Sequence, residues 1–179
     1  MSDEQTAHFL GGTPEEILEA RAASLAQEPA EEDASDRLSM LLFRIGEESY
    51  SVDVADVREI QQIVAFSEMP SADSGVVGMV NLRGNVVPAV DMRLLVGLEP
   101  VEYTLETPMI ITEVRNETLA LLVDEVQDVF ELAPGCLQES PALHSLSASM
   151  IGVARMDDGL IYVLDVDELA GAAVFGAAR

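Results

Sequence analysis

The sequence contains no lysine and no tryptophan, and all nine of its basic residues are arginine. Its 33 acidic residues give a formal net charge of -24 at pH 7. Such a charge repels nucleic-acid phosphates and anionic lipid headgroups, so we expect no nucleic-acid binding and no direct membrane contact. Partners with basic patches are favoured. A second interpretation is adaptation to high salt, where screening removes the like-charge repulsion, and composition does not separate the two.

Cysteine and histidine are also scarce, which excludes several kinds of chemistry. The single cysteine, Cys136, cannot form an intramolecular disulfide, and neither His8 nor His144 stands in a catalytic motif. Glycine-rich phosphate loops, calcium-loop spacing and Cys/His clusters are missing. We therefore expect no catalytic residue, no cofactor and no metal. A small acidic enzyme using surface carboxylates remains an alternative, because only spacing in three dimensions makes a carboxylate pair catalytic.

Long hydrophobic runs and aromatic residues are few. No run approaches the 18 apolar residues of a membrane span, and the first residues lack the basic and apolar regions of a secretory signal. These features predict a cytoplasmic protein. Because aromatics make up only 4% of a chain that is 49% hydrophobic, the core must be filled by Val, Leu, Ile and Met, which suit packed strands.

Residues 1–37 form an acidic N-terminal extension. Residues 1–36 hold ten acidic side chains against the single Arg21. Thr13 and Glu16 make a capping box around Pro14, which permits a helix over 14–27. An isolated helix of this length is marginal in water. We expect the extension to be largely disordered, and a docking helix for a partner is the less favoured alternative.

The rest of the chain is an internal repeat. Gly78 falls on Gly152 and Asp91 on Asp165 when the sequence is shifted by 74, and Leu41 falls on Ile110 when it is shifted by 69. The repeat divides 38–175 into two units, about 38–98 and 107–175. Each unit is marginal alone, so we expect the two to pack their apolar faces together as one domain.

Each unit is typical of small antiparallel sheets. Apolar residues alternate over 41–45 and again over 50–54, with a Gly-Glu-Glu turn between them. Residues 110–114 and 119–123 repeat this hairpin around an Asn-Glu turn. A mainly β fold of two small barrels or sheets around one core follows.

The segment Asn81-Leu82-Arg83-Gly84 is the most distinctive in the chain. Gly84 permits a tight reversal, which would raise Arg83 at the tip or flank of a hairpin. In so acidic a chain an arginine commonly pairs with a carboxylate of its own molecule, and Glu59 is the candidate. Pairing with Glu59 and recognition of a partner are equally favoured.

Several motifs together resemble the CheW-like domain of bacterial chemotaxis coupling proteins. They are F-x-I-G-x-E-x-Y-x-V-D-V at 43–54, G-M-V-N-L-R-G-N-V-V-P-A-V-D at 78–91, L-L-V-D-E-V-Q-D-V at 121–129 and G-V-A at 152–154. The 78–91 motif is highly specific, and the order and spacing of the set strengthen the resemblance. The acidic extension departs from minimal members, which leaves a chemosensory output other than swimming open.

The resemblance implies a non-catalytic adaptor of two SH3-like five-stranded β-barrel subdomains on a shared apolar core, with few short helices. It implies two partners, the cytoplasmic tip of methyl-accepting chemoreceptors and the CheW-like regulatory domain of the histidine kinase CheA. The chain would be monomeric when isolated and associated with receptor arrays through these partners. A decoy that occupies receptors without coupling is the alternative. The positions that match the family's receptor-binding groove are Val57, Glu59, Gly78, Arg83, Val126 and Val129.

Overall fold

The structure is a computed structural model that describes residues 37–69, 75–114, 116–133, 135–156 and 159–174. The acidic extension up to residue 36, including the helix predicted over 14–27, lies outside the described residues. Among the described residues, no helix has the length and apolar character needed to cross a membrane.

The described chain runs twice through six strands followed by a short helix, with one 3-10 turn at a different place in each series. The first series is β1 (Leu38–Ile45), β2 (Glu48–Asp53), the 3-10 turn η1 (Val54–Asp56), β3 (Val57–Gln62), β4 (Phe66–Glu68), β5 (Val76–Leu82), β6 (Asn85–Asp91) and α2 (Met92–Leu95). The second is β7 (Pro108–Val114), β8 (Glu117–Leu122), β9 (Glu125–Leu132), β10 (Leu137–Gln138), the 3-10 turn η2 (Ser147–Ser149), β11 (Met150–Met156), β12 (Gly159–Leu164) and α3 (Val166–Val174). Strand for strand, β1 to β6 correspond to β7 to β12, and α2 corresponds to α3.

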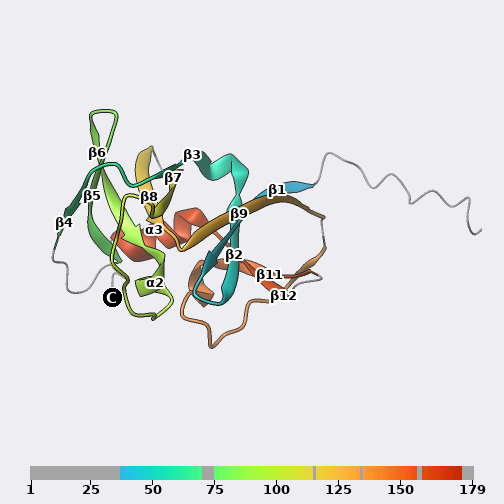
Figure 1. Cartoon of the computed structure of the whole chain (residues 1–179). Helices are drawn as coiled ribbons and strands as arrows, with labels where there is room; N and C mark the ends of the chain where they lie inside the picture. The colour runs from blue at the N-terminus through green and yellow to red at the C-terminus, as the bar shows by residue number, and fades with distance from the viewer. Residues whose placement is uncertain (1–36, 70–74, 115, 134, 157–158, 175–179) are drawn as a thin grey trace, which may run out of the picture. The chain divides into compact units, whose positions relative to one another are not determined.

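The strands form two six-stranded sheets (Figure 1). Sheet A has the order β10-β11-β12-β2-β1-β9, and sheet B has the order β3-β7-β8-β6-β5-β4. Read from the other edge, the order of sheet B is β4-β5-β6-β8-β7-β3, and each strand is the repeat counterpart of the strand at the same place in sheet A. The hairpin β7–β8 therefore takes the place in sheet B that β1–β2 has in sheet A. The parallel pairing keeps its register as well, because Val163 opposite Ser51 in sheet A corresponds to Ala89 opposite Ala120 in sheet B.

This exchange interlocks the two sequence units. Sheet A combines β9 to β12 of the unit 107–175 with the hairpin β1–β2 of the unit 38–98. Sheet B combines β3 to β6 of the unit 38–98 with the hairpin β7–β8 of the unit 107–175. Each sheet therefore contains strands of both sequence units. The mainly β fold of two small subdomains with few short helices is confirmed. Each sheet has six strands among the described residues, where five per barrel were predicted, because the short edge strands β4 and β10 join them.

The largest apolar cluster is shared by the two sheets. It joins Phe43 and Tyr50 of sheet A to Ile110 and Leu121 of sheet B, and Leu169 of α3 packs into it. Two smaller clusters lie within the individual sheets. The predicted shared core is therefore present, and it is the main apolar contact between the two sheets.

Two of the repeated residues now have a packing reason. A Cβ on Gly78 would lie 2.4 Å from the carbonyl oxygen of Ser67, and a Cβ on Gly152 would lie 2.6 Å from that of Gln138. Ser67 is on β4 and Gln138 on β10, so the edge strand of each sheet passes directly over a glycine. Any larger residue at these positions would push the edge strand away.

Candidate functional site

Four of the six predicted site residues lie on β3 and β9, the edge strands of sheets B and A. Val57 and Val126 are repeat counterparts, both half-buried, and both pack against the shared core. Val129 on β9 is 51% exposed. Its counterpart on β3, Ile60, is 46% exposed and was not among the predicted site residues. The repeat could have found Ile60, because it places Ile60 on Val129.

Gly78 is placed differently from the other site residues. It is buried on β5 beneath Phe66 and Ser67 of β4. Gly78 therefore shapes the surface only through the close approach of β4 to β5.

Arg83 is raised at the tip of the β5–β6 hairpin. Leu82 and Asn85 are the last paired residues, so Arg83 and Gly84 form a two-residue turn, and both have positive φ, 51° and 94°. Positive φ at both central residues is the requirement of a type I′ turn, which matches the twist of the strands. Asn81 accepts the N–H of Gly84 on its side-chain oxygen at 2.8 Å. The turn thus fixes the backbone of Arg83 while its side chain stays 83% exposed.

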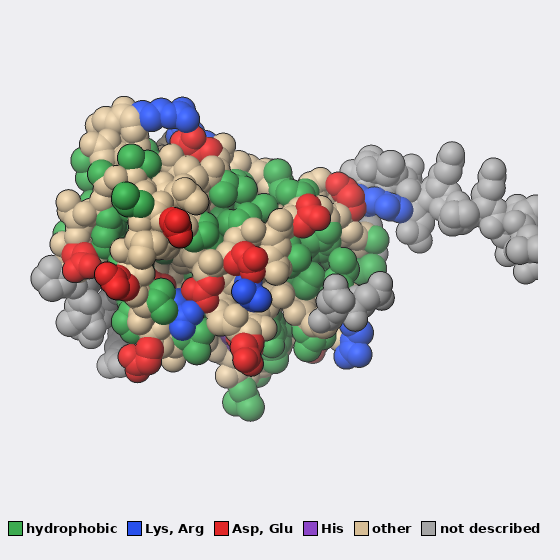
Figure 2. Space-filling model, viewed as in Figure 1, with side chains coloured by type: hydrophobic (Ala, Val, Ile, Leu, Met, Phe, Trp, Pro, Cys, Tyr) green, Lys and Arg blue, Asp and Glu red, His purple; other side chains and the backbone are tan. Residues whose placement is uncertain are grey.

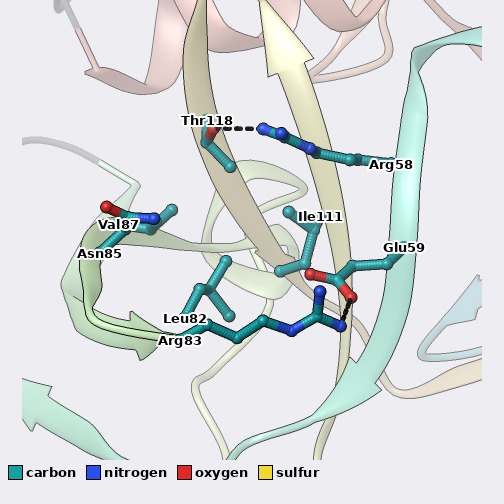
Figure 3. A pocket seen from close by; sticks show the side chains of 8 residues that line it. All are labelled: Arg58, Glu59, Leu82, Arg83, Asn85, Val87, Ile111 and Thr118. Atoms are coloured by element: carbon teal, nitrogen blue, oxygen red, sulfur yellow. Dashed lines mark hydrogen bonds and ion pairs between the residues drawn. The ribbon is translucent and has the colours of Figure 1, made fainter.

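The side chain of Arg83 reaches from the β5–β6 turn to Glu59 on β3 (Figure 3). Its Nη2 donates to Oε2 of Glu59 at 2.8 Å, and the Glu59 side chain is 30% exposed. The pairing alternative from the sequence is therefore real. An ion pair this exposed contributes only about 0–1 kcal/mol to stability, since water and salt screen it. The ion pair uses Nη2 of Arg83, and the guanidinium has further N–H donors that a partner can bind. Pairing with Glu59 and recognition of a partner are therefore compatible.

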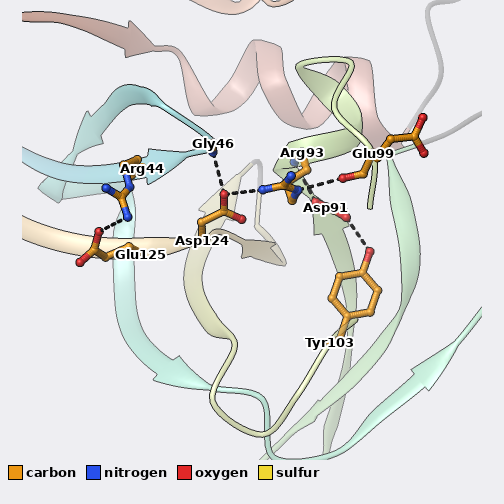
Figure 4. Close-up of polar contacts among 8 residues, drawn as sticks. All are labelled: Arg44, Gly46, Asp91, Arg93, Glu99, Tyr103, Asp124 and Glu125. Atoms are coloured by element: carbon orange, nitrogen blue, oxygen red, sulfur yellow. Dashed lines mark hydrogen bonds and ion pairs between the residues drawn. The ribbon is translucent and has the colours of Figure 1, made fainter. Parts of the chain in front are cut away.

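A polar network around Asp124 joins the two sheets (Figure 4). Oδ2 of Asp124 accepts the N–H of Gly46, in the β1–β2 turn, at 2.6 Å, and accepts Nη1 of Arg93, on α2, at 2.6 Å. Arg93 also donates through Nε to the carbonyl oxygen of Glu99. Because β1–β2 belongs to sheet A and α2 follows the sheet B strand β6, the Asp124 network holds the sheets in one arrangement.

The helix beside this network is capped by Asp91. Its Oδ1 accepts the N–H of Arg93 at 2.7 Å, and its Oδ2 accepts the hydroxyl of Tyr103 at 2.6 Å. Burial, together with the Asp91 carboxylate, raises the pKa of the Tyr103 phenol, so it remains a donor at neutral pH. The counterpart of Asp91, Asp165, caps α3 in the same way by accepting the N–H of Glu168.

His144 serves as a loop anchor. Its Nδ1 accepts the N–H of Leu146 at 3.1 Å, and its Nε2 lies 3.2 Å from the Tyr50 hydroxyl, which donates to Glu48. Burial and the Glu48 carboxylate raise the pKa of the Tyr50 phenol. Nδ1 thus orders the loop before η2, and Nε2 holds this loop against Tyr50 of β2. Within the described ranges, no three or more His, Cys, Asp or Glu residues gather closely enough to hold a metal ion.

Acidic side chains are spread over the face of the molecule in Figure 2, with arginines beside several of them. Four arginines of the described residues form ion pairs with carboxylates: Arg44 with Glu125, Arg58 with Glu113, Arg83 with Glu59 and Arg93 with Asp124. Most carboxylates have no arginine to pair with, because acidic residues far outnumber basic ones.

The model of the CheW-like domain family matches residues 39–174, nearly all of the described chain. The chain belongs to the CheW-like family. The chemotaxis protein CheW of Rhizobium meliloti is 30% identical over 132 residues, which cover 73% of this chain and 85% of that protein. Protein PilI of Pseudomonas aeruginosa is 27% identical over 126 residues, 70% of this chain and 69% of PilI.

A solved structure supports the same assignment. The crystal structure of the scaffolding protein TtCheW from Thermoanaerobacter tengcongensis matches with a TM-score of 0.64 and 26% identity, covering 72% of this chain and 84% of that one. The relatives are chemotaxis proteins CheW and a scaffolding protein, so this chain is a non-catalytic chemotaxis coupling adaptor, and the enzyme alternative is set aside.

Proposed function

We propose that this CheW-like protein couples methyl-accepting chemoreceptors to the histidine kinase CheA by binding the receptor's helical hairpin tip along β3 and β9. Val57 and Val126 supply half-buried aliphatic surface on these strands, and Val129 supplies exposed surface. An amphipathic helix lays its apolar stripe on such a surface, and charged residues at its margin fix the register.

The observation that carries the proposal is the placement of Arg83. A type I′ turn costs a non-glycine residue backbone strain at positive φ, and Arg83 occupies it at 51°. The weak ion pair with Glu59 does not account for an arginine at this position. The turn fixes the backbone of Arg83 and places its exposed side chain beside Glu59 of β3, which suits a recognition residue because little backbone freedom is lost on binding.

CheA is the second proposed partner, through its CheW-like regulatory domain. The isolated chain is proposed to be a monomer in the cytoplasm, brought to membrane receptor arrays by its partners. A chain that bound receptor without recruiting the kinase would be a decoy. Sedimentation of receptor-containing membranes with CheA, with and without this protein, distinguishes coupling from occupation.

The test of the receptor site is Arg83→Glu, measured by calorimetric titration with a soluble chemoreceptor hairpin fragment. We expect binding to weaken by about 2 kcal/mol or more, roughly 30-fold, because a charged anchor is replaced by repulsion. Unfolding free energy should change by no more than about 1 kcal/mol, the range for an exposed pair. Arg155→Glu is the matched control, since Arg155 is an exposed residue of β11, which is separated from β9 by three strands of sheet A.

A charge swap sharpens the test. The double variant Glu59→Arg with Arg83→Glu keeps opposite charges at the two positions and reverses their order. If Arg83 only stabilises the hairpin, the swap should restore both stability and binding. If Arg83 contacts the receptor, stability returns and binding stays weak. Unchanged affinity in well-folded Arg83→Glu protein would refute the receptor-contact assignment.

A further inference from the structure

A small pocket opens between β3, the β5–β6 hairpin and the β7–β8 hairpin, directly behind the Arg83–Glu59 pair. Its volume is about 150 Å³. Three buried aliphatic side chains line its apolar part: Leu82, Val87 and Ile111. Sites for whole small molecules measure about 300–1,000 Å³. The pocket therefore has room for one side chain and not for a metabolite or cofactor.

Two polar contacts border the opening on opposite sides, with Ile111 between them (Figure 3). One is the Arg83–Glu59 ion pair at 2.8 Å. On the other side Nη1 of Arg58 lies 3.5 Å from the hydroxyl of Thr118, at the limit of a hydrogen bond. The Arg58 side chain is 60% exposed and that of Arg83 is 83% exposed. Both guanidiniums can move aside at little cost, since exposed pairs are weak.

The internal repeat supplies a comparison within the same molecule. The corresponding opening of sheet A holds a pocket of about 200 Å³. Its lining residues include the repeat counterparts of the sheet B pocket: Leu42 for Ile111, Met156 for Leu82, Ile161 for Val87, Ser49 for Thr118 and Gln127 for Arg58.

The apolar floor is common to both openings, whereas the charged margin is not. Gln127 replaces Arg58, and the repeat sets Asp128 and Asp157 in the places of Glu59 and Arg83. An ion pair like Arg83–Glu59 needs a cation, and neither of these two sequence positions carries one. Because both openings hold a pocket, the pocket itself follows from the repeated fold. Arg58 and Arg83 at its margin distinguish the sheet B opening from the sheet A opening.

We infer that the sheet B pocket is an anchor site of the receptor interface, which takes one aliphatic side chain of leucine or isoleucine size from the receptor hairpin. This inference rests on the proposed function. The same helix presents a carboxylate one turn away, at i+3 or i+4, to Arg83 and Arg58. Each guanidinium has five N–H donors and uses few of them in its present contacts, so each can accept a new carboxylate partner.

In this arrangement the Arg83–Glu59 pair covers the apolar floor in the free protein and separates when the receptor side chain enters. The buried aliphatic contact supplies affinity, and the arginines supply selection for an acidic neighbour. A receptor segment without the acidic residue should then bind more weakly, although it fills the pocket equally well.

The test fills the pocket from within. Thr118→Phe places an aromatic ring at the opening, and Ser49→Phe makes the same change at the repeat counterpart. With a soluble chemoreceptor hairpin as the probe, we expect Thr118→Phe to weaken binding about tenfold or more and Ser49→Phe to leave it within about twofold. Both variants must retain the urea midpoint of a folded domain.

Measurements on the wild type keep the inference open to refutation if Thr118→Phe does not fold. Methyl resonances of Leu82, Val87 and Ile111 should shift on titration with the hairpin, while those of Leu42, Met156 and Ile161 stay in place. If a folded Thr118→Phe protein binds like wild type while Arg83→Glu loses binding, the pocket inference is overturned and the receptor site stands. If wild type does not bind the hairpin, the proposed function fails and the inference fails with it.

Discussion

Removing the carboxylate of Asp124 should loosen the junction between the two sheets. Its Oδ2 accepts two hydrogen bonds, from Gly46 and from Arg93, each at 2.6 Å. Asp124→Ala leaves the N–H of Gly46 without this acceptor and leaves Arg93 with the carbonyl of Glu99 as its remaining acceptor among these contacts. Both effects act on the folded state, so the free energy of unfolding should fall.

The size of the loss follows from how far the pair is buried. The side chains of Arg93 and Asp124 are 20% and 22% exposed. Exposed pairs contribute about 0–1 kcal/mol, and breaking a fully buried pair costs about 3–5 kcal/mol. A pair that is four-fifths buried, with a second charge-assisted bond to Gly46, should cost about 2–4 kcal/mol. That is a large part of the roughly 5–15 kcal/mol of a typical domain.

Urea unfolding measures this loss, with Glu125→Ala as the control. Glu125 is the next residue along the chain and pairs with Arg44 at 2.9 Å, with both side chains about half exposed (Figure 4). We expect its removal to cost about 1 kcal/mol or less. Asp124→Asn should fall between the two, because the amide oxygen can still accept from Gly46 but carries no charge. Equal costs for Asp124→Ala and Glu125→Ala would refute the claim that this network fixes the sheets.

Two further predictions concern stability. Ser51→Ala should raise the free energy of unfolding by about 1 kcal/mol, because the Ser51 hydroxyl is buried without a hydrogen-bond partner. The repeat already has alanine at the counterpart position, Ala120. A lower urea midpoint would mean that the hydroxyl has a hydrogen-bond partner. Sodium chloride should raise the urea midpoint of the wild type from its low-salt value, because screening relieves the repulsion of a chain with net charge -24. A midpoint that is flat or falls with salt would show that bound cations or ion pairs already compensate the carboxylates.

The site could be predicted in part because its signals are local. Asn81 and Gly84 are adjacent to Arg83 and specify the turn that raises it, so the position of Arg83 at a hairpin tip followed from the sequence. Its contact with Glu59 remained one of two alternatives, since the two residues are 24 positions apart and meet only when β3 and the β5–β6 hairpin border the same opening. The pocket behind Arg83 was missed for the same reason, whereas Ile60 could have been found from the repeat, which places it on Val129.

The sequence by itself determined the strands and their hairpins, because alternation and turn residues depend only on neighbouring residues. It also determined the shared core, because the repeat and the total of apolar side chains require the two units to pack together. The sequence did not determine which hairpin joins which sheet. Hairpins β1–β2 and β7–β8 have the same alternation, and Ser51 and Ala120 have equivalent registers. Either hairpin could therefore form the parallel pairing with β6 or with β12. Only the tertiary structure decided the exchange, because long-range packing around Phe43, Tyr50, Ile110 and Leu121 selects one pairing. That choice brings Glu59, Arg83 and Thr118 around a single opening.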